Sequence, residues 1–286
     1  MTPMTPESNA YPQDENLTKL AQLAPGVFRL SSPERNWMFY GSEHANGKIF
    51  NLYQIFSQLR ANFSQKTTSF LDCGSGNGLA ALVASIAGFE KVYGIEKNRP
   101  LFLEAQYNLS YCQEKNLLRN SNIYFFNASY YQLVNHHEDV VASCLQELNN
   151  FYEQDGIFNS SSFLEYAQAL LKEKNRSLKK MVENYLFSPD SNKNLKNSSL
   201  LKNGQLTADF VYIYPADLFF SRVFLPQIAK LLKKGAFLGI LSPADDKSEI
   251  EKDLLQKKEE IKLAAAPASL VLSIFQRVNT CLVCTK

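Results

Sequence analysis

Residues 69–82, SFLDCGSGNGLAAL, join an apolar segment to a helix-forming segment through a turn with a glycine at every second position. The apolar segment, typical of a buried strand, ends in a carboxylate, Asp72. Glycines let the backbone of such a turn adopt left-handed conformations and let a ligand approach it closely. The start of the following helix offers backbone N–H groups that have no partner within the helix. This stretch therefore predicts a strand, a ligand-binding turn and a helix.

Segments with strand and helix patterns alternate along the chain from this point. Strands that are apolar on both faces are typical of a parallel sheet covered by helices. Residues 134–206 interrupt the alternation, and there we expect helices but no strands. The predicted strands of the parallel part are 68–73, 91–96, 122–128, 209–215 and 236–243.

The C-terminal part predicts a charged helix over residues 246–262 and then two strands, 269–278 and 280–286. Their short connection at Asn279 suits an antiparallel hairpin at the edge of the sheet.

These patterns together predict an α/β fold class. We expect a doubly wound, Rossmann-like sheet of seven strands with an antiparallel C-terminal hairpin and a helical insertion before strand four. Residues 1–68 would form an N-terminal extension and helical layer, and residues 69–286 the domain that carries the insertion at 134–206.

Composition argues against several classes of protein, including membrane-spanning and secreted ones. The 286 residues are 45% hydrophobic, which is typical of a globular chain, and the formal net charge of +2 gives no strong attraction to nucleic acid or membranes. No apolar run has the roughly 18–20 residues of a membrane span, and residues 1–16 lack the pattern of a secretory signal. The five cysteines are scattered and odd in number, which argues against a disulfide scaffold and favours a cytoplasmic location.

Two pairs of residues resemble fragments of metal sites. Cys281 and Cys284 form a CxxC pair, and His136 and His137 are adjacent. Neither pair has further ligands at the spacing that a zinc site needs. We therefore expect structural thiols and no bound metal.

The glycine turn could serve either of two ligand classes. Dinucleotide-binding turns have the spacing G-x-G-x-x-G and place a pyrophosphate at the helix N-terminus. This chain has G-x-G-x-G, and Asp72 stands two residues before the first glycine. A carboxylate there repels a phosphate but attracts the ammonium and sulfonium charges of S-adenosylmethionine. We therefore expect S-adenosylmethionine and not a nicotinamide dinucleotide.

The segments LDCGSGNG (71–78) and VYGIEKN (92–98) resemble the first two motifs of the class I S-adenosylmethionine-dependent methyltransferases. The resemblance covers about residues 69–132 and 208–243 and the C-terminal end. It implies that Asp72 holds the methionine moiety, that Glu96 accepts hydrogen bonds from both ribose hydroxyls, and that Asn127 accepts one from the adenine amino group. The cofactor-binding residues that it implies in these motifs are Asp72, Cys73, Gly74, Ser75, Gly76, Gly78, Glu96, Lys97, Asn127 and Ala128.

In this family the methyl acceptor binds after strand four, where the chain has YIYPADLF (212–219). Many amine and amide methylases of the family carry an Asn/Asp-Pro-Pro-aromatic turn there, and this chain keeps one proline but lacks the leading amide or acid. As catalytic residues, Tyr214 would line the acceptor channel and Asp217 would orient or deprotonate an amine. Alternatively, Tyr214 packs and Asp217 caps the next helix.

An upstream segment, FYGSE (39–43), is similar to the Tyr-Gly-Glu segment of the Dot1-like lysine methyltransferases, which folds over the cofactor. The similarity implies that Tyr40 and Glu43 cover the ligand. Ser42 interrupts the Tyr-Gly-Glu order, and Tyr-Pro-Ala replaces the Asn-Asn-Phe usual after strand four. We expect a protein lysine as acceptor ahead of RNA or a small molecule. A non-catalytic protein that keeps the fold for binding is the alternative from another class.

Basic residues outnumber acidic ones in the insertion, between Lys172 and Lys202. A basic lobe beside the active site would recruit RNA or an acidic protein. Lysine-rich helices are also ordinary solvated surface, and no interleaved aromatic residues indicate base stacking here. We expect solvated surface first and RNA second, and we expect no membrane partner.

Overall fold

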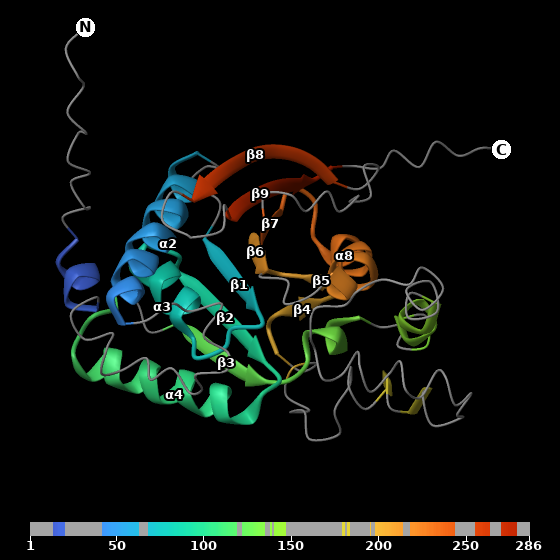
Figure 1. Cartoon of the computed structure of the whole chain (residues 1–286), viewed down its shortest axis with the longest axis horizontal. Coiled ribbons are helices and arrows are strands. Elements are labelled where there is room, and N and C mark those ends of the chain that lie inside the picture. Colours follow the sequence, from blue (N-terminus) through green and yellow to red (C-terminus); the bar gives the residue numbers. More distant parts are fainter. Residues whose placement is uncertain are drawn as a thin grey trace, which may run out of the picture.

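The structure is a computed structural model, drawn in Figure 1. It describes residues 14–20, 42–62, 68–118, 122–134, 138, 140–146, 179–180, 182–183, 195, 198–213, 218–243, 255–263 and 270–278.

A seven-stranded sheet forms the centre of this part of the chain, in the order β3-β2-β1-β6-β7-β9-β8 (Figure 1). The strands from β3 to β7 pair in parallel, and β9 is antiparallel to both of its neighbours. The predicted doubly wound sheet with an antiparallel C-terminal hairpin is thereby confirmed. The strands are β1 (Ser69–Cys73), β2 (Lys91–Glu96), β3 (Ile123–Asn127), β6 (Phe210–Ile213), β7 (Phe237–Pro243), β8 (Leu255–Leu263) and β9 (Leu270–Arg277).

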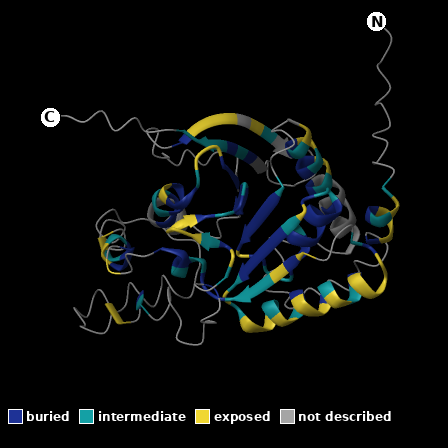
Figure 2. Cartoon of the chain, turned by 180° about the vertical axis from the view of Figure 1, so that it is seen from behind, coloured by how far each residue is buried: buried dark blue, intermediate teal, exposed yellow. Residues whose placement is uncertain are grey.

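Helices cover both faces of the sheet (Figure 1). One face carries α2 (Ser42–Asn62), α3 (Leu79–Ile86) and α4 (Arg99–Glu114), and the other carries α8 (Leu218–Leu231). The central strands β1 and β6 are buried along their whole length, as expected for parallel strands between two helical layers. Figure 2 shows the outer side of α4 as largely exposed.

Local signals set the ends of α4. The Asn98 side chain accepts a hydrogen bond from the Leu101 N–H at 3.3 Å, and Pro100 occupies the first turn, as the sequence predicts. The last turn ends near Asn116, which has a left-handed φ of 53°.

Helix α2 packs on the same core as the sheet. Its Phe56 ring lies 4.9 Å from that of Phe70 on β1, centroid to centroid, and Phe70 in turn lies 5.1 Å from Phe89. All three rings are fully buried, and burial of each aromatic side chain stabilises the fold by about 2–3 kcal/mol. The division of the chain into units at residue 68 stays a prediction.

The insertion contains a small hairpin that the sequence analysis did not predict. Strands β4 (Leu201–Lys202) and β5 (Gln205–Leu206) pair antiparallel around a turn in which Asn203 and Gly204 both have positive φ, 53° and 74°. Asn-Gly is the preferred pair for such a two-residue hairpin turn. The expectation of no strands in 134–206 is therefore wrong at its end.

Other described parts of the insertion belong to the core under α8. Val140, Val141 and Cys144, in a helical stretch at 140–146, are buried in the same apolar cluster as Leu71 on β1. Leu195 and Leu200 join this cluster from the end of the insertion. These segments thus help to cover one face of the sheet.

The predicted C-terminal helix is wrong over residues 255–262, which lie in β8. This strand pairs with β9 in an antiparallel hairpin, with an irregularity between Lys257 and Glu259. The run of Lys and Glu suggested a helix, but charged residues on the outermost strand also protect an exposed sheet edge from pairing with another chain. The hairpin therefore joins 255–263 to 270–277, and the predicted strand at 280–286, with Cys281 and Cys284, lies outside the described residues.

The remaining expectations concern membranes, metals and thiols. Within the ranges that the structure describes, no helix has the length and apolar character to cross a membrane. These ranges also hold no cluster of His, Cys, Asp and Glu suited to a metal, and His136 and His137 lie outside them. Cys73, Cys112 and Cys144 are buried thiols, and burial raises the pKa of Cys112 to about 12.

Candidate functional site

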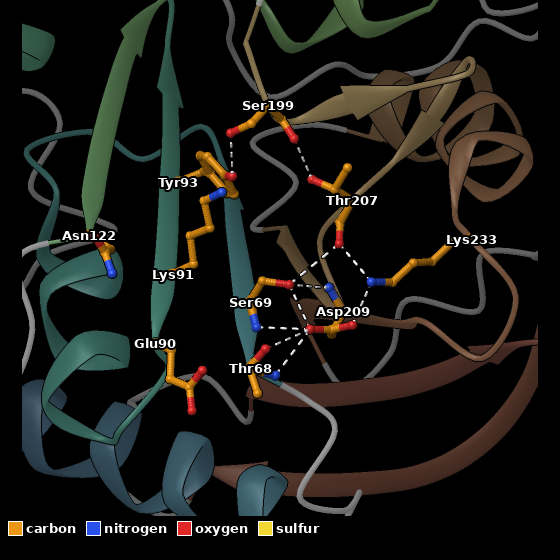
Figure 3. A pocket seen from close by; sticks show the side chains of 10 residues that line it. All are labelled: Thr68, Ser69, Glu90, Lys91, Tyr93, Asn122, Ser199, Thr207, Asp209 and Lys233. Atoms are coloured by element: carbon orange, nitrogen blue, oxygen red, sulfur yellow. Dashed lines mark hydrogen bonds and ion pairs between the residues drawn. The ribbon is translucent and has the colours of Figure 1, made fainter.

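A hollow of about 490 Å³ lies at the amino ends of β1 and β2 (Figure 3). At its base the Asp209 Oδ2 accepts hydrogen bonds from the Ser69 N–H at 2.9 Å and the Ser69 hydroxyl at 2.6 Å. The other oxygen, Oδ1, lies 2.6 Å from Nζ of Lys233, which also donates to the Thr207 carbonyl at 2.7 Å. These polar groups pair with one another and join three segments, so we assign the network to stability.

The network makes stability depend on pH. Burial would raise the pKa of Asp209, but hydrogen bonds from Lys233 and Ser69 outweigh it and hold the pKa below its ordinary value. The resulting stabilisation is present above the unfolded-state pKa of about 3.9 and is lost as the pH falls through the lower folded-state value. We expect Asp209→Asn to lower the free energy of unfolding by about 1–2 kcal/mol at neutral pH, and the difference to shrink below about pH 4.

Urea unfolding of both proteins at neutral and acidic pH measures this difference. Glu15→Gln is the matched control, because its partner Lys19 is on the surface and such pairs contribute little. A difference for Asp209→Asn that stays constant with pH would contradict the assignment.

The predicted cofactor residues lie at the opposite, carboxyl edge of the sheet. Strands β1, β2 and β3 are parallel, and their register places Cys73 beside Ile95 and Glu96 beside Asn127. The ends of the three strands, and the segments that follow them, therefore lie side by side, as parallel pairing requires.

The glycine turn is held against the end of β2. The N–H groups of Gly74 and Ser75 both donate to the Ile95 carbonyl, each at 2.9 Å, and the Ser75 carbonyl accepts from the Gly78 N–H at 2.8 Å. Gly74, Gly76 and Gly78 have φ values of 86°, 54° and 85°, which other residues adopt only at a cost. No described atom lies within 4 Å of the point where a Cβ on Gly76 would be. The turn is therefore rigid but open at Gly76.

Glu96 connects the glycine turn to the segment after β2. Its Oε2 accepts a hydrogen bond from the Gly76 N–H at 2.8 Å, and its Oε1 accepts one from the Asn98 N–H at 2.6 Å. Charge-assisted bonds of this length are among the stronger hydrogen bonds of proteins. They fix the carboxylate at the open side of the turn, where it can accept hydrogen bonds from a ligand.

The order of the sheet reverses between β1 and β6, and the glycine turn begins at this switch point, where doubly wound sheets bind ligands. Seven strands with β9 inserted antiparallel between β7 and β8, and acids at the ends of β1 and β2, complete the pattern. This is the fold of the class I S-adenosylmethionine-dependent methyltransferases. No protein-family model matches the sequence, and no curated protein matches it significantly.

Solved structures with a similar fold include three methyltransferases. Magnesium protoporphyrin IX methyltransferase from Synechocystis, with bound S-adenosylmethionine, is 12% identical over 92% of this chain and 97% of its own, with a TM-score of 0.46. A tRNA (m1A58) methyltransferase from Aquifex aeolicus is 15% identical over 82% and 69%, at 0.41. An RNA methyltransferase from Salinibacter ruber, in complex with S-adenosyl-L-homocysteine, is 10% identical over 80% and 91%, at 0.41.

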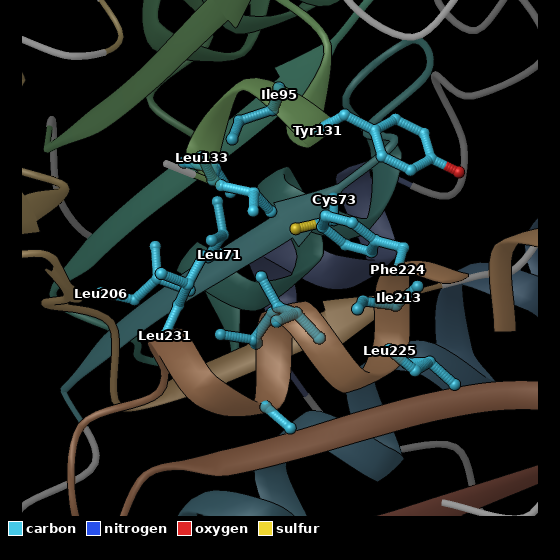
Figure 4. Close-up of a cluster of buried hydrophobic side chains, with 14 of the residues drawn as sticks. Leu71, Cys73, Ile95, Tyr131, Leu133, Leu206, Ile213, Phe224, Leu225 and Leu231 are labelled. Atoms are coloured by element: carbon cyan, nitrogen blue, oxygen red, sulfur yellow. The ribbon is translucent and has the colours of Figure 1, made fainter. Parts of the chain in front are cut away.

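Asp72 and Cys73 are the last two residues of β1, at the carboxyl edge of the sheet, and they differ in role. Both are buried, and burial together with the nearby Asp72 carboxylate raises the pKa of Cys73 well above its usual value. The thiol therefore stays neutral, and it lies in the apolar cluster near Phe224 (Figure 4). A cofactor role for Cys73 would have to use its backbone, whereas Asp72 brings a negative charge to the start of the turn.

The Asn127 amide is oriented by the backbone. Its Nδ2 donates to the carbonyls of Glu96, at 2.9 Å, and Lys97, at 3.2 Å. The amide oxygen, Oδ1, is therefore the atom that would accept a hydrogen bond from an adenine amino group. The Ala128 N–H donates to the Glu96 carbonyl at 3.0 Å, and the Lys97 side chain is exposed.

The expected acceptor and lid residues are not placed by the structure. Tyr40, Tyr214 and Asp217 lie outside the described residues, and Glu43 lies in α2 with its side chain outside them. Their roles stay predictions.

Sequence analysis missed an aromatic cluster beside the glycine turn. It comprises Tyr130 and Tyr131, in the short helix η2 (Tyr130–Leu133) after β3, and Phe224 in α8. The Phe224 ring lies 4.7 Å from Tyr130 and 5.0 Å from Tyr131, centroid to centroid. Figure 4 shows Tyr131 and Phe224 on the side of the sheet where Cys73 points. The sequence signal available was only the tyrosine pair directly after β3.

Proposed function

We propose that this chain is a methyltransferase that transfers a methyl group from S-adenosylmethionine to a nitrogen nucleophile. The observation that supports this most is the Glu96 carboxylate, hydrogen-bonded at 2.8 Å to the open glycine turn that begins beside the buried Asp72. In this proposal one acid serves the methionine end of the ligand and the other serves the ribose. The space at Gly76, where a Cβ would meet no described atom within 4 Å, fits a ligand lying against the backbone.

Each residue has a defined part in holding the donor. Asp72 attracts the ammonium and sulfonium charges, Glu96 accepts hydrogen bonds from the ribose hydroxyls, and the Asn127 oxygen accepts one from the adenine amino group. The bound cofactor supplies an electrophilic methyl group on a positively charged sulfur. The protein contributes mainly by alignment of the acceptor with that methyl group, and a base removes the proton of the acceptor nitrogen. Asp217 is our candidate for that base.

A protein lysine is the acceptor that we propose first, on the resemblance of residues 39–43 to the Dot1-like enzymes alone. RNA or a small molecule is the alternative. The described part of the basic insertion gives RNA little support, because Lys179 and Lys180 are exposed and Lys179 lies 3.7 Å from Glu183 in an ordinary surface pair.

Two experiments test this proposal. Calorimetry with S-adenosylhomocysteine tests the cofactor, and no binding by the wild type would overturn the proposal. Tritiated-methyl transfer into fractionated lysate tests the activity, with Glu96→Ala as the matched inactive control. Label in protein, RNA or small-molecule fractions identifies the acceptor class. Binding without label in any fraction would favour a non-catalytic binding protein.

A further inference from the structure

The buried side of α4 contains one polar residue. Ala105, Asn108 and Cys112 are the buried residues of this helix, and their spacing of three and four positions puts them on one face. Asn108 is only 1% exposed, so its amide has lost contact with water. A buried amide lowers stability unless its polar atoms find partners within the protein. The partners of Asn108 therefore determine whether this amide stabilises the fold.

Asn108 donates a hydrogen bond to the glycine turn. Its Nδ2 lies 3.0 Å from the backbone carbonyl oxygen of Asn77, the residue between Gly76 and Gly78. Ala105 contacts the turn from the same face of α4, because a Cβ on Gly78 would lie 3.1 Å from the Ala105 Cβ. Helix α4 thus packs directly against the second half of the turn, and its amide fixes the carbonyl there.

The same helix is also connected to the Glu96 carboxylate. That carboxylate accepts hydrogen bonds from the Asn98 N–H, at 2.6 Å, and from the Gly76 N–H, at 2.8 Å, and Asn98 caps the start of α4. A turn rich in glycine has wide backbone freedom. Two side-chain bonds restrain it here, one from Glu96 to the Gly76 N–H and one from Asn108 to the carbonyl of the next residue.

Stability alone would favour an apolar residue at position 108. Among the residues that the structure describes, none donates a hydrogen bond to the buried Asn108 Oδ1. A buried acceptor without a partner destabilises the folded protein. A leucine, of similar size, would avoid that penalty and extend the apolar face of Ala105 and Cys112. The gain that the amide brings is its bond to the turn, and polar groups that break the local apolar pattern are expected at functional sites.

We propose that Asn108 is a positioning residue for the binding of S-adenosylmethionine. The proposal rests on the function proposed above and adds to it a residue that acts through the glycine turn. By holding the Asn77 carbonyl, Asn108 keeps the turn in the orientation in which the Gly76 N–H meets Glu96 and the backbone at Gly76 is open to a ligand. A turn that is already ordered binds its ligand more tightly, because no ordering cost remains.

The test measures affinity, stability and local order in Asn108→Leu and Asn108→Ala. We expect both variants to bind S-adenosylhomocysteine about three- to tenfold more weakly than the wild type in calorimetry, the size of one lost neutral hydrogen bond. The urea midpoint of Asn108→Leu should stay at or above that of the wild type, since leucine removes the unpaired buried acceptor. Amide hydrogen exchange of the ligand-free protein should be at least about threefold faster at Gly76 and unchanged at Val92 in β2.

Ser85→Ala is the matched control. Ser85 lies in the last turn of α3, is fully buried, and has an Oγ with no partner among the described residues. The substitution therefore removes another buried, unpaired polar atom, and its affinity and its Gly76 exchange should equal those of the wild type. Equal weakening of binding by Ser85→Ala would overturn the proposal, because the effect would not be specific to the contact with the turn.

The outcomes separate this role from the proposed function. If the wild type binds the ligand and the folded Asn108 variants bind it equally well, or if Gly76 exchanges at the wild-type rate in them, the role of Asn108 is overturned and the cofactor assignment stands. Failure of both variants to fold also overturns the role, since Asn108 would then serve the fold. A wild type that does not bind overturns the proposed function, and the role of Asn108 with it.

Discussion

Glu96→Ala is expected to lower the affinity for S-adenosylhomocysteine about a hundredfold and to abolish methyl transfer at ordinary donor concentrations. The variant loses the acceptors that we assign to the ribose hydroxyls, and each hydrogen bond to a charged group contributes about 1.5–3 kcal/mol. It also loses the bonds to the Gly76 and Asn98 N–H groups, at 2.8 and 2.6 Å, which orient the glycine turn. Calorimetry measures the affinity, and hydrogen exchange of the Gly76 amide measures the loosening of the turn.

Glu96→Gln refines this expectation. The amide keeps one oxygen for a backbone N–H or a hydroxyl but has no charge and presents an N–H₂ group to the other partner. We therefore expect a loss of affinity between that of the wild type and that of Glu96→Ala. Glu90→Gln is the matched control, because Glu90 precedes β2 and lines the hollow at the opposite end of the strands. Undiminished binding by Glu96→Ala would sink the cofactor assignment.

The sequence predicted those parts of the fold and site in which neighbouring residues determine the structure. Asp72 and Glu96 each end a short apolar run, and parallel pairing of those runs brings their ends to one edge. The glycines mark a turn because their φ values of 54–86° suit no other residue well. Neither inference needed a contact between distant parts of the chain.

Parts that depend on distant residues were not predictable in this way. Tyr130 and Phe224 are separated by more than ninety residues in sequence, yet their rings lie 4.7 Å apart. Likewise, Ser69, Asp209 and Lys233 form one network only because β1 and β6 are neighbours in the sheet. The order of neighbouring residues in the sequence does not indicate such contacts between distant residues.

Composition misled the prediction of β8. Residues 255–262 contain three lysines and two glutamates, all strong helix formers, and helix propensity is worth only a few tenths of a kcal/mol per residue. Pairing with β9 along the whole strand outweighs that preference. By contrast, Asn203-Gly204 was a local signal for the β4–β5 hairpin, and the lysine- and asparagine-rich context concealed it.

The glycines of the turn also lead to predictions about stability that do not depend on any ligand. Gly78 has a φ of 85°, and a Cβ there would lie 2.7 Å from the Phe125 Cζ and 3.1 Å from the Ala105 Cβ. Gly78→Ala therefore combines a left-handed backbone with a steric overlap. We expect it to lower the free energy of unfolding by about 3 kcal/mol, of which roughly 1–2 come from the backbone and the rest from overpacking. Urea denaturation followed by circular dichroism measures the change.

Gly76→Ala separates the two costs, because Gly76 has a φ of 54° but meets no described atom within 4 Å of its would-be Cβ. We expect it to cost about 1 kcal/mol, the backbone term alone. The Phe125 ring cannot simply move away from Gly78, since it also covers Gly94, where a Cβ would lie 2.5 Å from Cδ1 of the same ring. Shortening the ring should therefore relieve the overlap, and Gly78→Ala combined with Phe125→Leu should cost less than the sum of the two single changes. Strictly additive losses would show that the Phe125 ring is not what requires glycine at position 78.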